Sequence, residues 1–212
     1  MLIRIAALVL AILLSGCATP LSGKVSRFHV LSGSSQSFVI LPTQDQGNSL
    51  EFRSYASLVT QQLRARGWRE ATLENADVAI FFQYQISQEK QVAFSYPVLG
   101  QVASNTSYTT GTISTYGNMS TLNATTTRPT TLGVVGTGTG SRTEFDRAVR
   151  LTMYSGPAYR TTRTMDRVYE GEFRSSGSTG DLPTVMPALI SGLFFDFPGQ
   201  SGSVRAVDVP LQ

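Results

Sequence analysis

Two glutamates towards the C-terminus have a spacing that could support hydrolytic chemistry. Glu170 and Glu172 lie two residues apart in a predicted strand, so their carboxylates would project from one face about 7 Å apart. Paired carboxylates at such separations act as acid and base in glycoside hydrolysis. Four arginines lie in or near the same pair of predicted strands: Arg150, Arg163, Arg167 and Arg174. Ion pairing across the strands explains the glutamates more simply than catalysis does.

His29 is the only histidine of the chain, and it limits the other catalytic arrangements. A Ser-His-Asp site would have to use it, yet its place between Phe28 and Val30 near the tether favours an ordinary strand residue that faces a turn or solvent. The glycines from Gly136 to Gly140 superficially resemble a phosphate-binding loop, but the lysine of such loops does not follow them. We expect a flexible turn there. No enzymatic activity, metal site or cofactor is predicted.

Cys17 is the only cysteine, and the residues before it point to lipidation. An uncharged run at 5–14 is far shorter than the roughly 20 apolar residues that span a membrane, and it is typical of a signal peptide. The segment Leu14-Ser15-Gly16-Cys17 resembles the lipobox of bacterial lipoproteins. This resemblance implies cleavage between Gly16 and Cys17 and a diacylglycerol thioether on the Cys17 sulfur.

A cluster of aromatic and basic residues lies around the end of the first predicted helix. Phe52, Tyr55 and Trp68 are expected to pack in the core. The alternative is that the arginines around them contact lipid phosphates, because a lipid anchor would hold the domain close to a membrane surface. These arginines are Arg64, Arg66 and Arg69.

The composition excludes several classes of protein. The chain has 212 residues, of which 41% are hydrophobic and only 15% are charged. Its net charge of +3 is too small for a polybasic nucleic-acid binder. One cysteine and one histidine provide neither a disulfide framework nor a zinc cluster. The length allows one domain with a sizeable core.

The hydrophobic pattern predicts an α+β fold: a two-layer sandwich in which two amphipathic helices cover a mostly antiparallel sheet. The first helix begins with Asn48 in a capping box and ends at Gly67. The second begins after Asp181, with Pro183 in its first turn, and reaches about residue 197. Strands are expected near 27–31, 38–42, 77–88, 142–153 and 162–174, with a turn at 154–157.

A long Thr/Ser/Gly-rich segment interrupts this pattern. From Gln91 to Ser141 the only charged residue is Arg128. The segment could be a β-prone strand pair, a disordered loop or an oligomerisation surface. The expected organisation is a signal peptide at 1–16, a lipidated tether at 17–24, an α+β domain at 25–202 with the insert at about 91–141, and a C-terminal tail at 203–212.

Several short segments, in this order, resemble one protein family. Besides the lipobox they are Phe38-Val39-Ile40-Leu41-Pro42, Leu63-Arg64-Ala65-Arg66-Gly67-Trp68, Ala76-Asp77-Val78, Tyr169-Glu170-Gly171-Glu172 and Phe195-Asp196-Phe197-Pro198-Gly199. They resemble the bacterial lipoproteins that carry domain of unknown function 4136, over about Val25–Gly202. That family often has Trp at the position of Tyr169 and a Tyr/Gly/Pro-rich insert. The resemblance implies an α+β domain on a lipid anchor and brings no established activity or catalytic residues.

These features predict a lipid-anchored cell-envelope protein of a non-enzymatic binding or assembly-accessory type. Ala18 after Cys17, by resemblance to enterobacterial sorting rules, favours the outer membrane, with the domain facing the periplasm. The expected partners are the membrane, through the anchor, and an envelope protein or a second copy; nucleic acid is not expected. Two alternatives stay open: an envelope hydrolase that uses Glu170 and Glu172, and a structural lipoprotein that self-associates through Gln91–Ser141.

Overall fold

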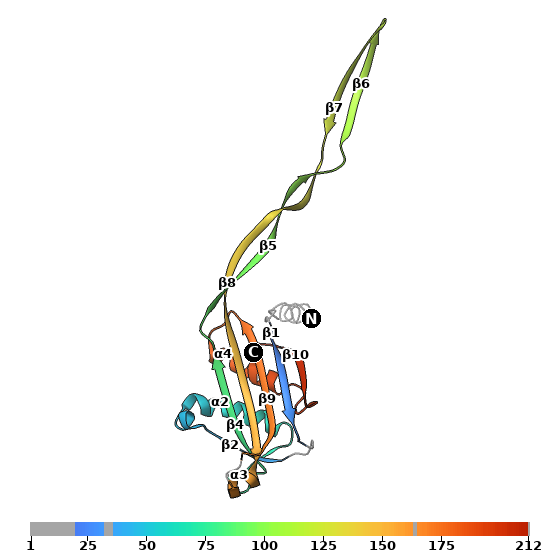
Figure 1. Cartoon of the computed structure of the whole chain (residues 1–212). Helices are drawn as coiled ribbons and strands as arrows, with labels where there is room; N and C mark the ends of the chain where they lie inside the picture. The colour runs from blue at the N-terminus through green and yellow to red at the C-terminus, as the bar shows by residue number, and fades with distance from the viewer. Residues whose placement is uncertain (1–19, 32–35, 163–164, 212) are drawn as a thin grey trace, which may run out of the picture. The chain divides into compact units, whose positions relative to one another are not determined.

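The computed structural model describes residues 20–31, 36–162 and 165–211, which form a mixed α and β fold with one large sheet (Figure 1). These residues divide into two compact units. The first runs to Lys90, resumes at Thr143, and holds the hydrophobic core. The second is Gln91–Arg142, so the predicted insert at 91–141 forms a unit of its own.

The large sheet combines strands from both ends of the chain. Its order is β10 (Ser203–Val209), β1 (Leu21–His29), β9 (Arg167–Gly177), β8 (Thr130–Ser155), β4 (Val78–Ile86), β2 (Ser37–Leu41) and β3 (Arg69–Glu70). Neighbours from β10 to β4 are antiparallel, whereas β2 pairs in parallel with β4 and β3. The core therefore joins segments that are far apart in the sequence.

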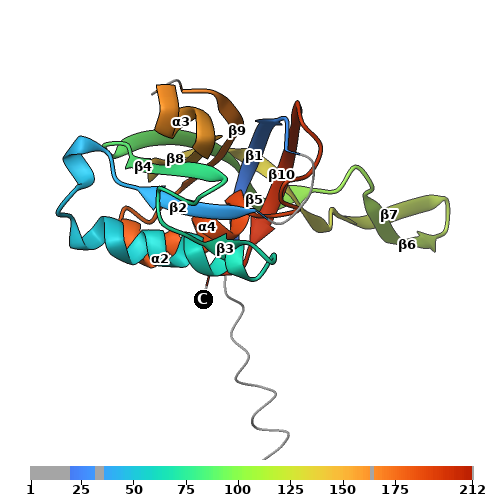
Figure 2. The ribbon, with the colours of Figure 1, turned by 90° about the horizontal axis from the view of Figure 1, so that it is seen from below.

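Two longer helices cover one face of this sheet. They are α2 (Leu50–Arg64) and α4 (Leu182–Leu193), which pack against each other on the same side (Figure 2). Helix α4 packs on β1, β9 and β10. A short 3-10 helix, η1 (Gln44–Gln46), precedes α2, and α3 (Gly156–Thr162) packs against β4.

Helix α2 begins slightly later than the sequence indicates. Ser49, and not Asn48, is its N-cap, and the Ser49 hydroxyl accepts a hydrogen bond from the backbone N–H of Phe52 at 3.1 Å. The helix ends at Arg64 with Ala65 as its C-cap, before the predicted end, and the predicted glycine closes the turn that follows. Gly67 adopts a φ of 82°, and its N–H and that of the next residue donate to carbonyls of the last turn.

Helix α4 begins where the sequence predicts. Asp181 is its N-cap and Pro183 lies in the first turn. The helix ends at Leu193, earlier than predicted, because Phe194 leaves the helical conformation with a ψ of 3°. Its sheet-facing side chains are buried, among them Val185, Met186, Leu189, Ile190 and Leu193.

The side chain of Phe173 in β9 packs against both β1 and α4. It is fully buried. A Cβ on Gly23 of β1 would lie 2.3 Å from its ring, and a Cβ on Gly192 of α4 would lie 2.6 Å from it. Both positions therefore require glycine, because any side chain would push the strand or the helix off the ring.

Both ends of the domain are strands where the sequence predicts a tether at 17–24 and a tail at 203–212. Strand β1 already begins at Leu21, which lies opposite Val209 of β10. Both predictions were wrong for the paired residues. The alternating pattern of β1 is masked because Gly23 and Arg27 take two of the inward positions next to Leu21 and Val25.

The predicted turn at 154–157 is the end of β8 followed by helix α3. The N–H of Gly156 donates to the Asp77 carbonyl at 2.7 Å, and a Cβ on Gly156 would lie 2.0 Å from the Ala76 carbonyl oxygen. Pro157 occupies the start of the helix, where a backbone N–H would have no partner within the helix, so proline costs no hydrogen bond there. Strand β9 begins at Arg167, after the predicted start near 162.

The second unit consists of paired strands. Strand β5 (Lys90–Ala103) pairs with β8, and β6 (Tyr108–Tyr116) pairs with β7 (Met119–Thr127). The flexible turn predicted at Gly136–Gly140 was wrong, because these residues lie within β8. A Cβ on Gly138 would lie 2.6 Å from the Tyr96 ring, and a Cβ on Gly140 would lie 2.8 Å from the Phe94 ring. Alternate glycines therefore make room for aromatic rings of the facing strand.

Candidate functional site

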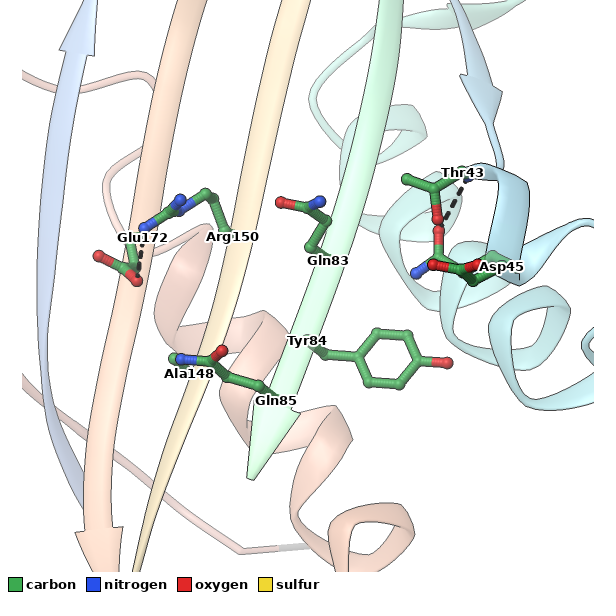
Figure 3. Close-up of a pocket in the computed structure, with 9 residues that line it drawn as sticks. Thr43, Asp45, Gln83, Tyr84, Gln85, Ala148, Arg150 and Glu172 are labelled. Atoms are coloured by element: carbon green, nitrogen blue, oxygen red, sulfur yellow. Dashed lines mark hydrogen bonds and ion pairs between the residues drawn. The ribbon is translucent and has the colours of Figure 1, made fainter. Parts of the chain in front are cut away.

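A polar cavity of about 320 Å³ lies where β4 passes the segment around η1 (Figure 3). Strand register places Gln83 opposite Arg150, and Arg150 opposite Glu172. Three neighbouring strands thus contribute a row of polar side chains to one face of the sheet. The complete lining is Thr43, Asp45, Gln46, Gln83, Tyr84, Gln85, Ala148, Arg150 and Glu172.

Both glutamates of the hydrolase hypothesis are ion-paired. The Nη2 of Arg150 lies 3.2 Å from Glu172 Oε1, and the Nη2 of Arg174 lies 2.9 Å from Glu172 Oε2. The Nη1 of Arg167 lies 2.7 Å from Glu170 Oε2. The expected cross-strand pairing is confirmed for Arg150 and Glu172, whereas Arg163 lies outside the described residues. This arrangement favours a structural role for both carboxylates, because each already has a cationic partner.

The remaining wall of the cavity is held in place by hydrogen bonds. The backbone N–H of Thr43 donates to Gln46 Oε1 at 3.1 Å, and Gln46 Nε2 donates to the Phe82 carbonyl at 3.3 Å. The amides of Gln83 and Gln85 leave donors and acceptors exposed towards solvent. The cavity can therefore hydrogen-bond a polar group. In the part of the chain that the structure describes, no three His, Cys, Asp or Glu side chains gather as metal ligands.

His29 is a strand residue that faces a turn, as the sequence predicts, although it lies beside a serine that sequence reasoning missed. Its ring stacks on Tyr169 with 5.8 Å between centroids, and burial raises the pKa of Tyr169 to about 12. The Nε2 of His29 lies 3.1 Å from the Gly199 carbonyl oxygen, and the backbone N–H of His29 donates to Ser201 Oγ at 2.8 Å. His29 thus links the turn after α4 to β1 through these two contacts. Its Nε2 contacts a carbonyl oxygen, whereas a catalytic base would contact the hydroxyl of a nucleophile.

Arg27 is a buried arginine that sequence reasoning also missed. Only 1% of its surface is exposed. Its Nη2 donates to the Leu193 carbonyl at 3.1 Å and to the Phe195 carbonyl, and its Nη1 donates to the Asp196 carbonyl at 3.5 Å. The last carbonyls of a helix have no partners within the helix. Arg27 therefore caps α4, and its positive charge faces the negative end of the helix dipole.

A second arginine contacts the same turn. The Nη2 of Arg66 donates to the Phe194 carbonyl at 2.8 Å. Burial lowers the pKa of Arg66, and the charge of Arg27 lowers it further. Gly199 has a φ of 65°, and a Cβ there would lie 2.8 Å from Arg27 Nη1. Arg27 thus contacts the segment Phe195–Gly199, which resembles a family motif, and Arg66 contacts Phe194 directly before it.

The cluster proposed for lipid phosphates is mostly used within the fold. Phe52, Tyr55 and Trp68 are buried, so their predicted place in the core is confirmed. Arg64 forms an ion pair with Glu70 on the surface, and Arg66 contacts Phe194 as described above. The geometry therefore gives no separate support to a lipid-binding role for this cluster.

Most of the large apolar side chains that are exposed among the described residues lie in the Gln91–Arg142 unit. Every residue of β6 and β7 is exposed, in contrast to the closed core of the main unit. At the β6–β7 hairpin the exposed fractions reach 94% for Tyr116, 76% for Met119, 71% for Ile113 and 66% for Leu122. Strand alternation places Ile113 and Leu122 on one face of the hairpin and Tyr116 and Met119 on the other. Exposed apolar side chains and open strand edges are features of surfaces that bind other chains.

The predicted cleavage and lipidation residues, Gly16 and Cys17, lie outside the described residues. Their roles stay predictions. Within the described ranges, none of the helices combines the length and the apolar character needed to cross a membrane.

Comparison with known proteins identifies a family. No curated protein matches the chain. Among solved structures, a PDZ domain protein from Parabacteroides distasonis is similar with a TM-score of 0.45 and 9% identity, over 91% of this chain; this chain spans 40% of that protein's length. A family model described as "Domain of unknown function (DUF4136)" matches residues 32–199. The chain therefore belongs to the DUF4136 family.

Proposed function

We propose that this protein is a lipid-anchored component of the bacterial cell envelope, and that it is a non-enzymatic binding or assembly accessory that works through its Gln91–Arg142 unit. The observation that carries the proposal is the contrast between the two units. The main unit buries its apolar side chains in one core, whereas the second unit exposes residues such as Ile113 and Leu122. A surface of this kind is suited to contact with another protein.

The main unit fits the role of a stable platform. Helix α4 packs on three strands of the sheet and on α2, which supports the reading of this unit as a two-layer α+β sandwich. The geometry of Glu170 and Glu172 does not favour the hydrolase alternative, because each carboxylate forms an ion pair with an arginine. Binding without catalysis is therefore the function that these contacts favour.

The anchor is supported by the sequence alone. Cys17 is the only cysteine of the chain and follows Leu14-Ser15-Gly16, as a lipobox requires. Anchoring by two or more acyl chains is stable, since each buried CH₂ contributes about 0.8 kcal/mol. The preferred location is the outer membrane, with the domain in the periplasm, because Ala18 follows the cysteine.

Changing Cys17 to serine is expected to release the protein from membranes, because serine offers no thiol for the thioether. The measurement is membrane fractionation of cells that express Cys17→Ser or the unchanged chain, with globomycin treatment of the latter. Globomycin should make a larger precursor accumulate. Thr19→Ser is the control and should stay in the membrane fraction. If Cys17→Ser also stays there and globomycin has no effect, the anchor is disproved.

Photo-crosslinking in the intact envelope tests the binding surface. A photoreactive residue at Tyr116, which is 94% exposed on the hairpin, should yield a discrete crosslinked protein. The same probe at Ser54, an exposed position of α2, should not. Crosslinks from Ser54 but not from Tyr116 would move the interaction to the main unit and contradict the proposal.

A further inference from the structure

The edges of the β6–β7 hairpin lack the protection that the outer strands of the large sheet carry. Exposed edges invite pairing with other chains, and proteins usually guard them with charged residues or proline. The outermost strands of the large sheet follow this rule, since β10 carries Arg205 and Asp208, and β3 consists of Arg69 and Glu70. Neither β6 nor β7 contains a charged residue or a proline.

The hairpin is nevertheless well defined as a β-structure. Its nine cross-strand pairs run from Tyr108 opposite Thr127 to Tyr116 opposite Met119. The hydroxyls of Thr109 and Thr126 lie 2.8 Å apart, and Ile113 lies opposite Leu122. A lone two-stranded hairpin is at best marginally stable in water, and further strands on its edges would stabilise it.

We propose that the partner of this hairpin is the same hairpin of a second copy, with β7 of one copy paired antiparallel to β6 of the next. This inference rests on the proposed function, because it names the partner of the exposed unit. Selection of a different protein usually uses complementary charge, and these strands offer none. A second copy meets them with strands of equal length, the same β-branched residues and no repelling charge.

The direction of the strands favours β7-to-β6 pairing over pairing of like strands. Antiparallel β6–β6 or β7–β7 pairing would point the two hairpin tips in opposite directions. When β7 pairs with the next β6, every hairpin points the same way. Copies anchored in one membrane share one orientation, so among these antiparallel arrangements the head-to-tail one suits the anchor. A head-to-tail contact leaves one edge open at each end and can add further copies.

Charge pairs at Ile113 and Leu122 test the arrangement, because these residues face each other within the hairpin and, in the same register, across the interface between copies. The full chain is extracted in detergent, and its mass is measured by sedimentation. The unchanged chain should have a mass of two or more copies. Ile113→Lys/Leu122→Lys should reduce it to one copy, whereas Ile113→Lys/Leu122→Glu should keep the oligomer. Ser54→Lys/Ser57→Lys adds the same two charges to the exposed side of α2 and should have no effect.

The outcomes separate this inference from the proposed function. An unchanged chain that sediments as one copy at every concentration overturns the inference, and so does an oligomer that survives the Lys/Lys change. An oligomer lost equally in the Lys/Lys and Lys/Glu variants overturns head-to-tail pairing. If the chain is a single copy while the Tyr116 probe crosslinks a different protein, the proposed function stands and only the choice of partner fails.

Discussion

Replacing Arg27 with methionine is expected to lower the free energy of unfolding by about 3 kcal/mol. Methionine fills much of the volume, but three carbonyls lose their donors: that of Leu193, the last residue of α4, and those of Phe195 and Asp196 in the turn after it. Exchanging a buried ion pair for apolar groups can be neutral when both partners go. Here the partners are backbone groups that stay, so the change leaves them without hydrogen bonds.

Urea unfolding followed by the fluorescence of Trp68, the only tryptophan, measures this effect. Arg205→Met is the matched control, because Arg205 lies on the neighbouring strand β10 and pairs with Asp196 while half exposed. An exposed ion pair of this kind contributes less than about 1 kcal/mol. Equal losses for Arg27→Met and Arg205→Met would show that Arg27 does not cap α4.

Replacing Phe173 with alanine is expected to lower the free energy of unfolding by about 4 kcal/mol. The ring is fully buried, and Gly23 and Gly192 both lie against it. Neither glycine has a side chain that can move into the space, so the cavity stays open between β1 and α4. The cost should therefore lie near the upper end of the range for such substitutions.

The control for this second change is Phe28→Ala. Phe28 belongs to β1 as well, but 60% of its surface is exposed. Its removal should alter the unfolding free energy by no more than about 0.5 kcal/mol. The same urea experiment compares both variants, and similar losses would contradict the central packing role of Phe173.

The sequence predicts the helices well because their determinants are local. Gly67 closes the turn after α2 by its own left-handed conformation, and Asp181 with Pro183 defines the start of α4. The pairing of Glu172 with Arg150 was also predictable, since alternation places both on one face of neighbouring strands. These features need only a few neighbouring residues to specify them.

The role of Arg27 could not be predicted, because its partners lie at the far end of the chain. An arginine at an inward position breaks the apolar alternation and makes β1 look shorter than it is. The structure places the end of α4 against β1, and there the Arg27 guanidinium donates a hydrogen bond to the Leu193 carbonyl. Gly138 and Gly140 could not be predicted as strand residues for a similar reason. Their glycine-rich sequence indicates a turn, and only the structure shows the aromatic rings of β5 packed against them.

The position of β1 between β9 and β10 has a consequence for the order of folding. Leu21 pairs with Val209, so the first described strand is completed by the last described strand. Contacts of such long sequence separation require a large loop to close, and they slow folding. The middle of the sheet therefore cannot be completed until both β9 and β10 have been synthesised. Until then β1 has two open edges, and open edges of this kind are prone to pair with other chains.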